Sequence, residues 1–295
     1  MTGLLSDNTD GPRRLRALLS RDEPVLAPGV SDALGARLVA QAGFDAAYMT
    51  GFGTAATRLG RPDVGLLTMT EMVDTAHNIV RSGGLPVIAD ADTGYGNAVN
   101  VVRTVQEFEQ AGVAAIHLED QVSPKRCGHL EGKQVVPADE MAAKIRAAVA
   151  ARHSDDFIVI ARTDAAAVEG MDAAIERARR YRDEGADALF IEAATTEADI
   201  ERVASEFAGV PLLFNWVDGG KTPPMSLDRI REFGFAIVIF PISTLLAATN
   251  AMRGVLAQIK AGGTPSPGDA DLGFAGFVEL IGLAEIQDLD RRFTG

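Results

Sequence analysis

The sequence predicts an α/β protein folded as one (β/α)8 barrel, the TIM-barrel architecture, with an extra C-terminal helix. Three observations support this prediction. Eight short apolar runs alternate with segments of helical periodicity, a helix–glycine–strand pattern recurs, and the runs end in polar residues. The length of 295 residues lies in the range that single barrels of this type occupy.

The eight apolar runs are the expected strands. In chain order they cover residues 24–27, 46–49, 86–89, 114–118, 157–161, 186–191, 210–214 and 235–240. The intervening segments have apolar residues at three- and four-residue spacing, most clearly at 100–110, 138–151 and 171–183. The repeats QAGFDAAYMT, QAGVAAIHLED and DEGADALFIEA each place a glycine between a helix end and a strand. Eight such units close a barrel without leaving an edge, which favours a barrel over an open sheet.

The chain is expected to contain a catalytic barrel with an N-terminal helix at residues 1–263, followed by a linker and a C-terminal helical segment at 264–295. Proline, glycine and aspartate gather at 264–271, and an apolar segment follows at 274–286. An exposed apolar helix face needs a cover. The pattern leaves open whether this helix packs on a neighbouring subunit or on its own barrel.

Composition excludes several functional classes. The net charge of −13 disfavours binding to nucleic acid or to anionic membranes. The longest apolar stretches are too short to cross a bilayer, and the first residues lack the hydrophobic centre of a secretory signal, so we expect a cytoplasmic protein. The single cysteine, Cys127, excludes an intramolecular disulfide.

Polar residues stand where the expected strands end, which is where this architecture carries its active sites. Few of them are residues that stabilise a strand. Each alone has an alternative explanation as a helix cap or a loop residue, but together at one mouth they predict an active site. In chain order they are Thr50, Asp90, Asp92, Glu119, Asp120, Arg162, Glu192 and Asn215.

Asp90 and Asp92 predict a metal site. They end a buried strand at positions i and i+2, so the pleat directs both carboxylates to the same side. Two such charges repel unless they are protonated or bridged by a cation, and oxygen ligands without histidine or thiolate favour Mg²⁺, with Mn²⁺ possible, over Zn²⁺. Glu119 can contact the metal through a metal-bound water. The metal would stabilise the negative charge of an enolate formed from a bound 2-oxo carboxylate. The alternative is a pair of capping aspartates in a loop.

Two further segments could hold a substrate carboxylate. Thr50-Gly51-Phe52-Gly53 can turn backbone N–H groups toward an anion, because its glycines allow close approach. Arg162 offers a fork that suits a carboxylate, and an ion pair between Arg162 and Glu192 is the alternative.

The loop after the fourth strand contains the only thiol. Lys125, Arg126 and His129 surround Cys127, and these groups should lower the pKa of the thiol. Such a thiol can donate a proton to an enolate, and Gly128 and Gly132 would let the loop close over the site. The alternative is a solvent-facing basic loop with an incidental cysteine.

The segment Lys125–His129 resembles the signature loop of the isocitrate lyase and phosphoenolpyruvate mutase superfamily. The other matching motifs are TGFG from Thr50, RPDVGLLT from Arg61, DADTGYGN from Asp90, HLEDQ from His117, ARTDA from Ala161, EA from Glu192 and NWVDGGKTP from Asn215. The resemblance covers nearly the whole chain, and it implies a homotetramer with exchanged C-terminal helices.

The resemblance also implies roles for individual residues. Asp90 and Asp92 would be metal-site residues assisted by Asp63 and Glu119. Cys127 would protonate the enolate, with Tyr48 and His129 as the other candidate catalytic residues. The implied substrate-binding residues are Thr50, Gly51, Phe52, Gly128, Arg162, Glu192 and Asn215.

One departure narrows the predicted activity. Methylisocitrate lyases, which this chain resembles, carry an arginine shortly after strand eight, where this chain has Leu246. A third substrate carboxylate would lack its cation. We therefore predict a Mg²⁺-dependent carbon–carbon lyase that cleaves a 2-hydroxy dicarboxylate, such as an alkylmalate or a methylisocitrate-like acid, to a 2-oxo acid and a carboxylic acid. A P–C bond-forming mutase, an oxaloacetate hydrolase and an inactive metabolite-binding barrel are the alternatives.

Overall fold

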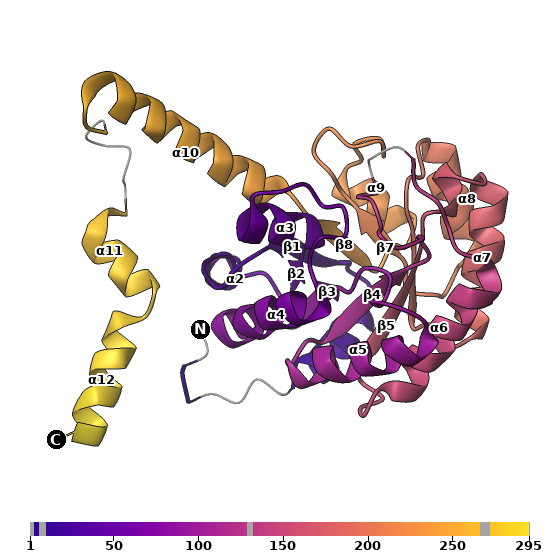
Figure 1. Ribbon diagram of the computed structural model, residues 1–295, viewed down its shortest axis with the longest axis horizontal. Helices are drawn as coiled ribbons and strands as arrows, with labels where there is room; N and C mark the ends of the chain where they lie inside the picture. The colour runs from indigo at the N-terminus through magenta and orange to yellow at the C-terminus, as the bar shows by residue number, and fades with distance from the viewer. Residues whose placement is uncertain (1–2, 6–9, 129–131, 266–271, 295) are drawn as a thin grey trace.

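The computed structural model describes residues 3–5, 10–128, 132–265 and 272–294. In this part of the chain, eight parallel strands alternate with helices around a common axis (Figure 1). The expected (β/α)8 barrel is therefore confirmed. The strands are β1 (Val25–Val30), β2 (Ala47–Met49), β3 (Val87–Asp90), β4 (Ala115–Glu119), β5 (Ile158–Thr163), β6 (Ala188–Ile191), β7 (Leu213–Asn215) and β8 (Ile237–Phe240).

The strands pair in the order β6-β5-β4-β3-β2-β1-β8-β7. A single parallel bridge between Leu189 and Leu212 joins β6 to β7, so the barrel is nearly closed. The strand register places polar groups of neighbouring strands side by side. Asp90 on β3 lies beside His117 on β4, and Glu119 on β4 lies beside Arg162 on β5.

Helices surround the strands and have identifiable start signals. Thr68 and Glu71 form a capping box at the start of α4, and Asn97 and Asn100 do the same for α5. The helices of the barrel are α1 (Gly11–Leu19), α2 (Ala33–Gln41), α3 (Gly51–Leu59), α4 (Met69–Gly83), α5 (Ala98–Gln110), α6 (Ala138–Ala151), α7 (Met171–Asp183), α8 (Glu197–Glu206) and α9 (Leu227–Glu232), with a 3₁₀ turn at Ala165–Ala167.

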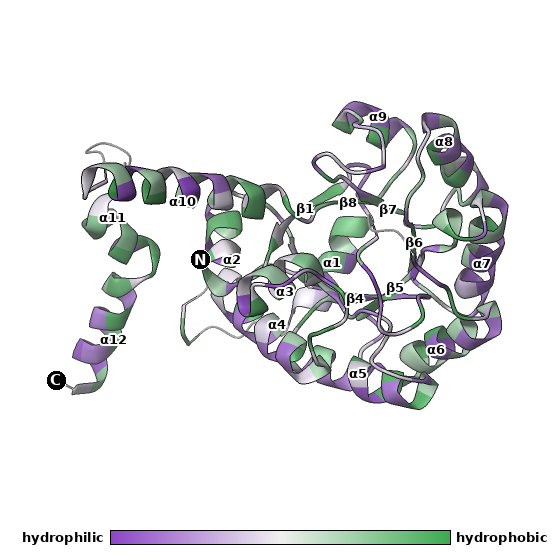
Figure 2. Ribbon diagram, turned by 45° about the horizontal axis from the view of Figure 1, so that its top comes forward, coloured by the Kyte–Doolittle hydropathy of each residue, from purple (hydrophilic) through white to green (hydrophobic). Residues whose placement is uncertain are grey.

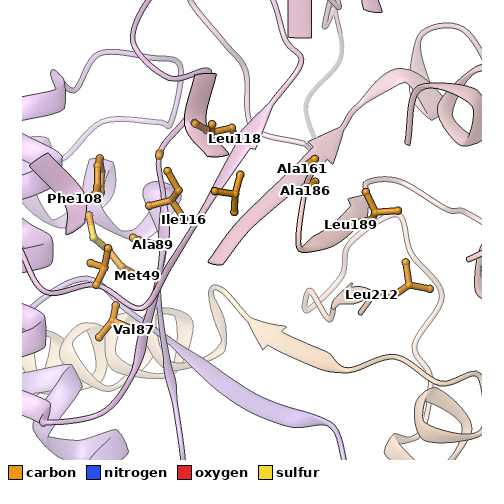
Figure 3. Close-up of a cluster of buried hydrophobic side chains, with 14 of the residues drawn as sticks. Met49, Val87, Ala89, Phe108, Ile116, Leu118, Ala161, Ala186, Leu189 and Leu212 are labelled. Carbon is orange, nitrogen blue, oxygen red and sulfur yellow. The ribbon is translucent and has the colours of Figure 1, made fainter. Parts of the chain in front are cut away.

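Two apolar layers hold the barrel together. The larger lies between strands and helices, where Met49, Phe108 and Ile116 are fully buried (Figure 3). The smaller fills the barrel interior and includes Leu15 and Leu18 of α1, which is seen through the ring of strands in Figure 2. Full burial of such side chains contributes roughly 1.5–3 kcal/mol each. Helix α1 thus packs into the barrel interior.

The C-terminal helices leave the barrel. Helix α10 (Ser243–Gly262) has no buried residue and projects from the end of β8 (Figure 1). Two helices follow, α11 (Gly273–Leu280) and α12 (Leu283–Thr294), where the sequence suggested one apolar segment at 274–286. The first turn of α10 still contacts the barrel, because Thr244 Oγ1 donates to the carbonyl of Gly29 at 2.7 Å. No helix among the described residues has the length and apolar character needed to span a membrane.

An apolar groove of about 630 Å³ lies beside the base of α10. Leu34 and Leu38 of α2 line one side, and Leu245 and Met252 of α10 line another. Arg37 of α2 donates a hydrogen bond to the carbonyl of Leu280 at 3.3 Å, so the end of α11 contacts the outer side of α2. The groove is therefore bounded by α2 and by the projecting helix α10.

Candidate active site

A cavity of about 240 Å³ opens at the carboxyl ends of the strands. Ten of the residues selected from the sequence line it, namely Tyr48, Thr50, Phe52, Asp63, Asp90, Cys127, Gly128, Arg162, Glu192 and Asn215. Three others, Gly51, Asp92 and Glu119, are buried but do not line the cavity. His129 lies outside the described residues. The cavity is therefore the candidate active site.

Buried carboxylates gather at one end of this cavity. Asp90 ends β3, and its Oδ1 accepts a hydrogen bond from the backbone N–H of Asp92 at 2.9 Å. Asp92 has a φ of 48°, a left-handed conformation that is uncommon outside glycine. Lys125 Nζ lies 2.6 Å from Asp63 Oδ2 and 2.8 Å from Asp92 Oδ1. The ammonium group of Lys125 is thus held by carboxylates.

Glu119 and Arg162 form the neighbouring part of the site. Arg162 Nε lies 3.2 Å from Glu119 Oε2 and 2.9 Å from Asp164 Oδ2. The ion-pair partners of Arg162 are therefore these two carboxylates, where the sequence suggested Glu192 as an alternative. Glu192 instead accepts a hydrogen bond from Asn215 Nδ2 at 3.0 Å.

The acidic cluster formed by Asp63, Asp90, Asp92 and Glu119 needs more positive charge than its neighbours provide. Lys125 and Arg162 supply two positive charges against these four buried carboxylates. Burial raises the pKa of Asp92 to about 6, and burial also raises the pKa of Glu119 well above its usual range. Glu119 Oε1 is buried without a hydrogen-bond partner. Such a cluster fits a divalent cation.

No three His, Cys, Asp or Glu side chains form a preformed metal cage within the residues that the structure describes. This arrangement is compatible with Mg²⁺, which keeps several water ligands and uses one or two carboxylates in most protein sites. Asp90 lines the cavity, whereas Asp92 and Glu119 lie behind it. Of these three carboxylates, Asp90 is therefore the one that a ligand in the cavity can reach directly.

Helix α3 begins against the acidic cluster. Thr50 caps this helix by accepting a hydrogen bond from the backbone N–H of Gly53 at 3.1 Å. A Cβ atom on Gly51 would lie 2.3 Å from Asp90 Oδ2, so only glycine fits. The close approach expected of the TGFG segment is therefore made to Asp90. The positive end of the α3 dipole faces this carboxylate.

Tyr48 has a partner that the sequence did not predict. Its hydroxyl lies 2.8 Å from Nε2 of His117, and the two rings are stacked with an interplanar angle of 17°. The same nitrogen lies 3.6 Å from Asp90 Oδ1. In the sequence, His117 was noted only as part of the HLEDQ motif. The alternation of side chains along β4 directs His117 into the barrel interior, so it was not among the strand-end residues.

The thiol loop brings Cys127 to the cavity. The backbone N–H of Cys127 donates to the carbonyl of Asp63 at 3.2 Å, which ties the loop to the segment that follows α3. A Cβ atom on Gly128 would lie 2.6 Å from Arg162 Nη2 and 2.9 Å from Glu192 Oε1. Glycine therefore lets the loop backbone contact the polar groups on β5 and after β6.

Two buried residues near the site, Asp164 and Lys133, were not selected from the sequence. Asp164 pairs with Arg162 and with Lys133. Asp120 was selected as a strand-end residue but does not line the cavity. Its carboxylate accepts hydrogen bonds from Thr163, Tyr181 and the backbone of Asp164. Asp120 therefore supports the β5 end of the site.

The match to a family model decides where this chain belongs. Residues 15–260 match the model described as phosphoenolpyruvate phosphomutase, and the match includes every strand and every site residue described above. The chain belongs to this family. The resemblance inferred from the KRCGH loop and its accompanying motifs is thereby confirmed.

Relatives in the family include lyases. A 2,3-dimethylmalate lyase from Eubacterium barkeri is 46% identical over 95% of this chain and 97% of its own length. A probable 2-methylisocitrate lyase from Corynebacterium glutamicum is also 46% identical, over 88% of this chain and 86% of its own length. The expectation of a carbon–carbon lyase of this superfamily is confirmed at the level of the enzyme class.

Solved structures extend the comparison to other reactions. An oxaloacetate acetylhydrolase bound to 3,3-difluorooxalacetate has a TM-score of 0.93 and 40% identity, covering 98% of this chain and 99% of its own. A phosphonopyruvate hydrolase bound to oxalate and Mg²⁺ has a TM-score of 0.87 and 33% identity, covering 97% of this chain and 99% of its own. The family includes metal-binding enzymes that act on small oxo acids.

Proposed function

We propose that this protein is a Mg²⁺-dependent lyase that cleaves a carbon–carbon bond of an alkyl-substituted 2-hydroxy dicarboxylate, giving a 2-oxo acid and a carboxylic acid. The proposal is supported by one cavity that is lined by three kinds of residue. Buried carboxylates and Arg162 form the inner wall, Cys127 lies on the loop side, and apolar side chains form much of the rest. Each wall supports one part of a retro-aldol cleavage.

The acidic cluster would hold the metal. Asp90 would contact the ion, while Asp92, Glu119 and Asp63 would bind its water ligands. The ion would supply positive charge that stabilises the substrate oxygens and the negative charge that develops during bond cleavage.

The chain's own residues would carry the proton transfers. Arg162 would orient a substrate carboxylate, and Tyr48 would lie at the substrate hydroxyl. The proton of the substrate hydroxyl would pass to the Tyr48 oxygen as Tyr48 passes its own proton to Nε2 of His117, 2.8 Å away. The alkoxide carbon would then become the carbonyl of the 2-oxo acid as the adjacent carbon–carbon bond breaks. The electron pair of that bond stays on the leaving fragment as an enolate, and the Cys127 thiol would protonate it, with His129 as a further candidate catalytic residue.

The outer part of the cavity favours an alkyl group over a third carboxylate. Val217, Ile239, Pro241 and Ile242 line it, and Asp218 is the acidic residue beside them. Leu246, which stands where methylisocitrate lyases carry arginine, does not line the cavity and is 40% exposed on α10. Among the described lining residues the cations are Lys125, which is paired with Asp63 and Asp92, and Arg162, which would hold the first substrate carboxylate. A third carboxylate would therefore have no cation to neutralise it.

Hydrolysis of oxaloacetate is the second candidate, because the structure of the oxaloacetate acetylhydrolase superposes over nearly the full length. The experiment that separates the candidates is a Mg²⁺-dependent screen of 2-alkylmalates, 2-methylisocitrate, oxaloacetate and phosphonopyruvate with the products identified. A 2-oxo acid and a carboxylic acid formed from an alkylmalate would support the lyase. The lyase would be excluded if oxaloacetate were the only substrate turned over, giving oxalate and acetate. It would also be excluded if only phosphonopyruvate reacted.

The proposed assembly is a homotetramer in which C-terminal helices are exchanged between subunits. Helix α10 carries exposed apolar side chains at Met252, Leu256 and Ile259, and α11 carries Phe274 and Phe277. The groove beside α2 is lined largely by apolar side chains, and it would receive such a helix face from a second copy.

A further inference from the structure

The loop that carries Cys127 begins and ends at the same place. Gln121 and Val135 form an antiparallel bridge. Beside it, the backbone N–H of Val122 donates to the carbonyl of Gln134, and that of Val136 donates to the carbonyl of Asp120, both at 2.8 Å. The excursion from β4 is therefore closed at its base, and its tip needs other contacts to have a fixed position.

Three consecutive residues at the tip have their backbone held by three different partners. The side chain of Gln121 accepts from the N–H of Arg126 and donates to its carbonyl, at 3.0 and 2.8 Å. The N–H of Cys127 donates to the carbonyl of Asp63 at 3.2 Å. The carbonyl of Gly128 accepts from Lys133 Nζ at 2.6 Å. The thiol thus lies between fixed backbone groups on both sides.

Lys133 differs from Gln121 and Asp63 because it also pairs with a carboxylate that binds Arg162. Its Nζ lies 2.8 Å from Asp164 Oδ1, and both side chains are almost completely buried, at 2% and 0% exposure. Asp164 accepts two hydrogen bonds from Arg162 as well, at 2.9 Å from Nε and 3.2 Å from Nη2. Asp164 therefore joins the thiol loop to the guanidinium group that faces the cavity.

Asp164 is the one anion between the two cations in this chain of contacts. The charges of these cations hold its pKa at about 2, below the usual value, although burial alone would raise it. Without Lys133, the whole charge of Asp164 would be directed at Arg162, and the carbonyl of Gly128 would lose its donor. The position of the loop and the charge on Arg162 that is free for a ligand would change together.

We propose that Lys133 is a positioning residue that fixes the Cys127–Gly128 backbone against Arg162 by holding the Gly128 carbonyl and Asp164 at once. The proposal rests on the proposed function in so far as Cys127 and Arg162 act on one substrate. In this role Lys133 sets the distance between the guanidinium group of Arg162, which binds the carboxylate, and the thiol of Cys127, which transfers the proton. Displacement of reacting groups by about 1 Å can lower a rate about 100-fold.

The test compares Lys133→Met with Arg152→Met as a matched control. Arg152 also donates to a backbone carbonyl and to a carboxylate, those of Phe157 at 3.1 Å and Asp187 at 2.8 Å. Phe157 and Asp187 immediately precede β5 and β6, so this control lies at the opposite end of the barrel from the thiol. Both variants lose a cation with the same kinds of partner, and a general loss of stability should affect them alike.

The main measurement is the rate at which iodoacetamide alkylates the protein, since the chain has one cysteine. Melting temperature, kcat and KM are measured beside it. With Lys133→Met we expect alkylation about tenfold faster, because the thiol is no longer held in one position. We also expect kcat to fall about 100-fold. Arg152→Met should lower the melting temperature and leave the alkylation rate and kcat within about twofold of wild type.

Two results would overturn the proposal. One is folded Lys133→Met protein that is alkylated at the wild-type rate. The other is an equal change of the alkylation rate in Lys133→Met and Arg152→Met, which would indicate general loosening. The alkylation rate does not depend on the substrate, so failure of the proposed lyase activity would leave this result interpretable.

Discussion

The hydroxyl of Tyr48 and the imidazole of His117 share a hydrogen bond of 2.8 Å inside the barrel, beside the carboxylate of Asp90. Burial lowers the pKa of His117 to about 4 and raises the pKa of Tyr48 well above its usual value. At neutral pH the pair therefore consists of a neutral imidazole and a protonated phenol. It can orient a hydroxyl group at the substrate without adding charge to the site.

Substitution of Tyr48 by Phe should lower kcat with a small effect on KM, because the ring remains and only the hydroxyl is lost. General acid–base groups contribute about 10²–10⁴-fold, and we expect a decrease in this range in steady-state assays of the best substrate. The control is Phe52→Leu, which alters the cavity wall without removing a polar group. A Tyr48→Phe variant with kcat within threefold of wild type, roughly 0.6 kcal/mol, would contradict the assignment.

Replacement of Cys127 by Ser should abolish most turnover while preserving ligand binding, because a hydroxyl is a much weaker acid than a thiol. We expect kcat to fall by about 100-fold or more and the affinity for oxalate to change little. Steady-state assays and calorimetric titration with oxalate in the presence of Mg²⁺ test this expectation. Equal losses of turnover and oxalate affinity would instead indicate a role in binding.

Alanine at Gly51 should weaken metal binding, because its Cβ would lie 2.3 Å from Asp90 Oδ2 and displace that carboxylate. We expect Mg²⁺ affinity, measured by calorimetric titration, to fall at least about tenfold, as losses of supporting groups around metal sites do. The matched control is Gly254→Ala on α10, where a Cβ meets no atom within 4 Å. Unchanged affinity in Gly51→Ala would show that Asp90 does not contact the ion.

Asp92 should make the metal-free protein less stable as pH rises. Its pKa is about 6 in the folded protein and 3.8 for the free side chain, so the folded state binds its proton more tightly. Stability is therefore lost as pH rises from about 4 to about 6, by about 3 kcal/mol at most. Asp92→Asn lacks this dependence.

The corresponding measurement is urea denaturation of wild type and Asp92→Asn at pH 4.5 and pH 7 with EDTA present. The variant should gain stability relative to wild type at the higher pH. Added Mg²⁺ should stabilise wild type more than the variant, because binding to the folded state adds to its stability. A stability difference that shrinks as pH rises would refute the expected sign.

Charges on the apolar face of α10 should prevent assembly. Met252 and Leu256 are 58% and 64% exposed, and we expect the double variant Met252→Asp with Leu256→Asp to dissociate, since burial of two charges in an apolar contact is costly. Arg253→Asp on the same helix is the control for a change of charge alone. Sedimentation measures the mass. A wild-type monomer, or a variant with the wild-type mass, would exclude the proposed exchange.

The barrel could be predicted from the sequence because most strands are short apolar runs that end at polar residues, as at Val87–Asp90. Local patterns also identified Asp90, Asp92 and the glycines of the TGFG segment. They could not identify the pairing of Lys125 with Asp63 and Asp92, because three separate loops bring these residues together. Lys133 was missed for the same reason, since its partner Asp164 follows a different strand.

The course of the C-terminal helices was also not predictable from local pattern. An apolar helix face after β8 suits contact with its own barrel and contact with another copy equally well. Thr244 in the first turn of α10 donates to the carbonyl of Gly29 at 2.7 Å, and beyond this turn α10 projects from the barrel with no buried residue.

Helix α1 packs Leu15 and Leu18 into the barrel interior on the side away from the cavity. In the described part of the chain, α1 fills that end of the barrel, and the cavity opens at the carboxyl ends of the strands. The two products of cleavage must then leave one after the other through the opening that the thiol loop lines. The product that is bound more deeply leaves last. Product inhibition should be competitive for the last fragment to depart and noncompetitive for the first.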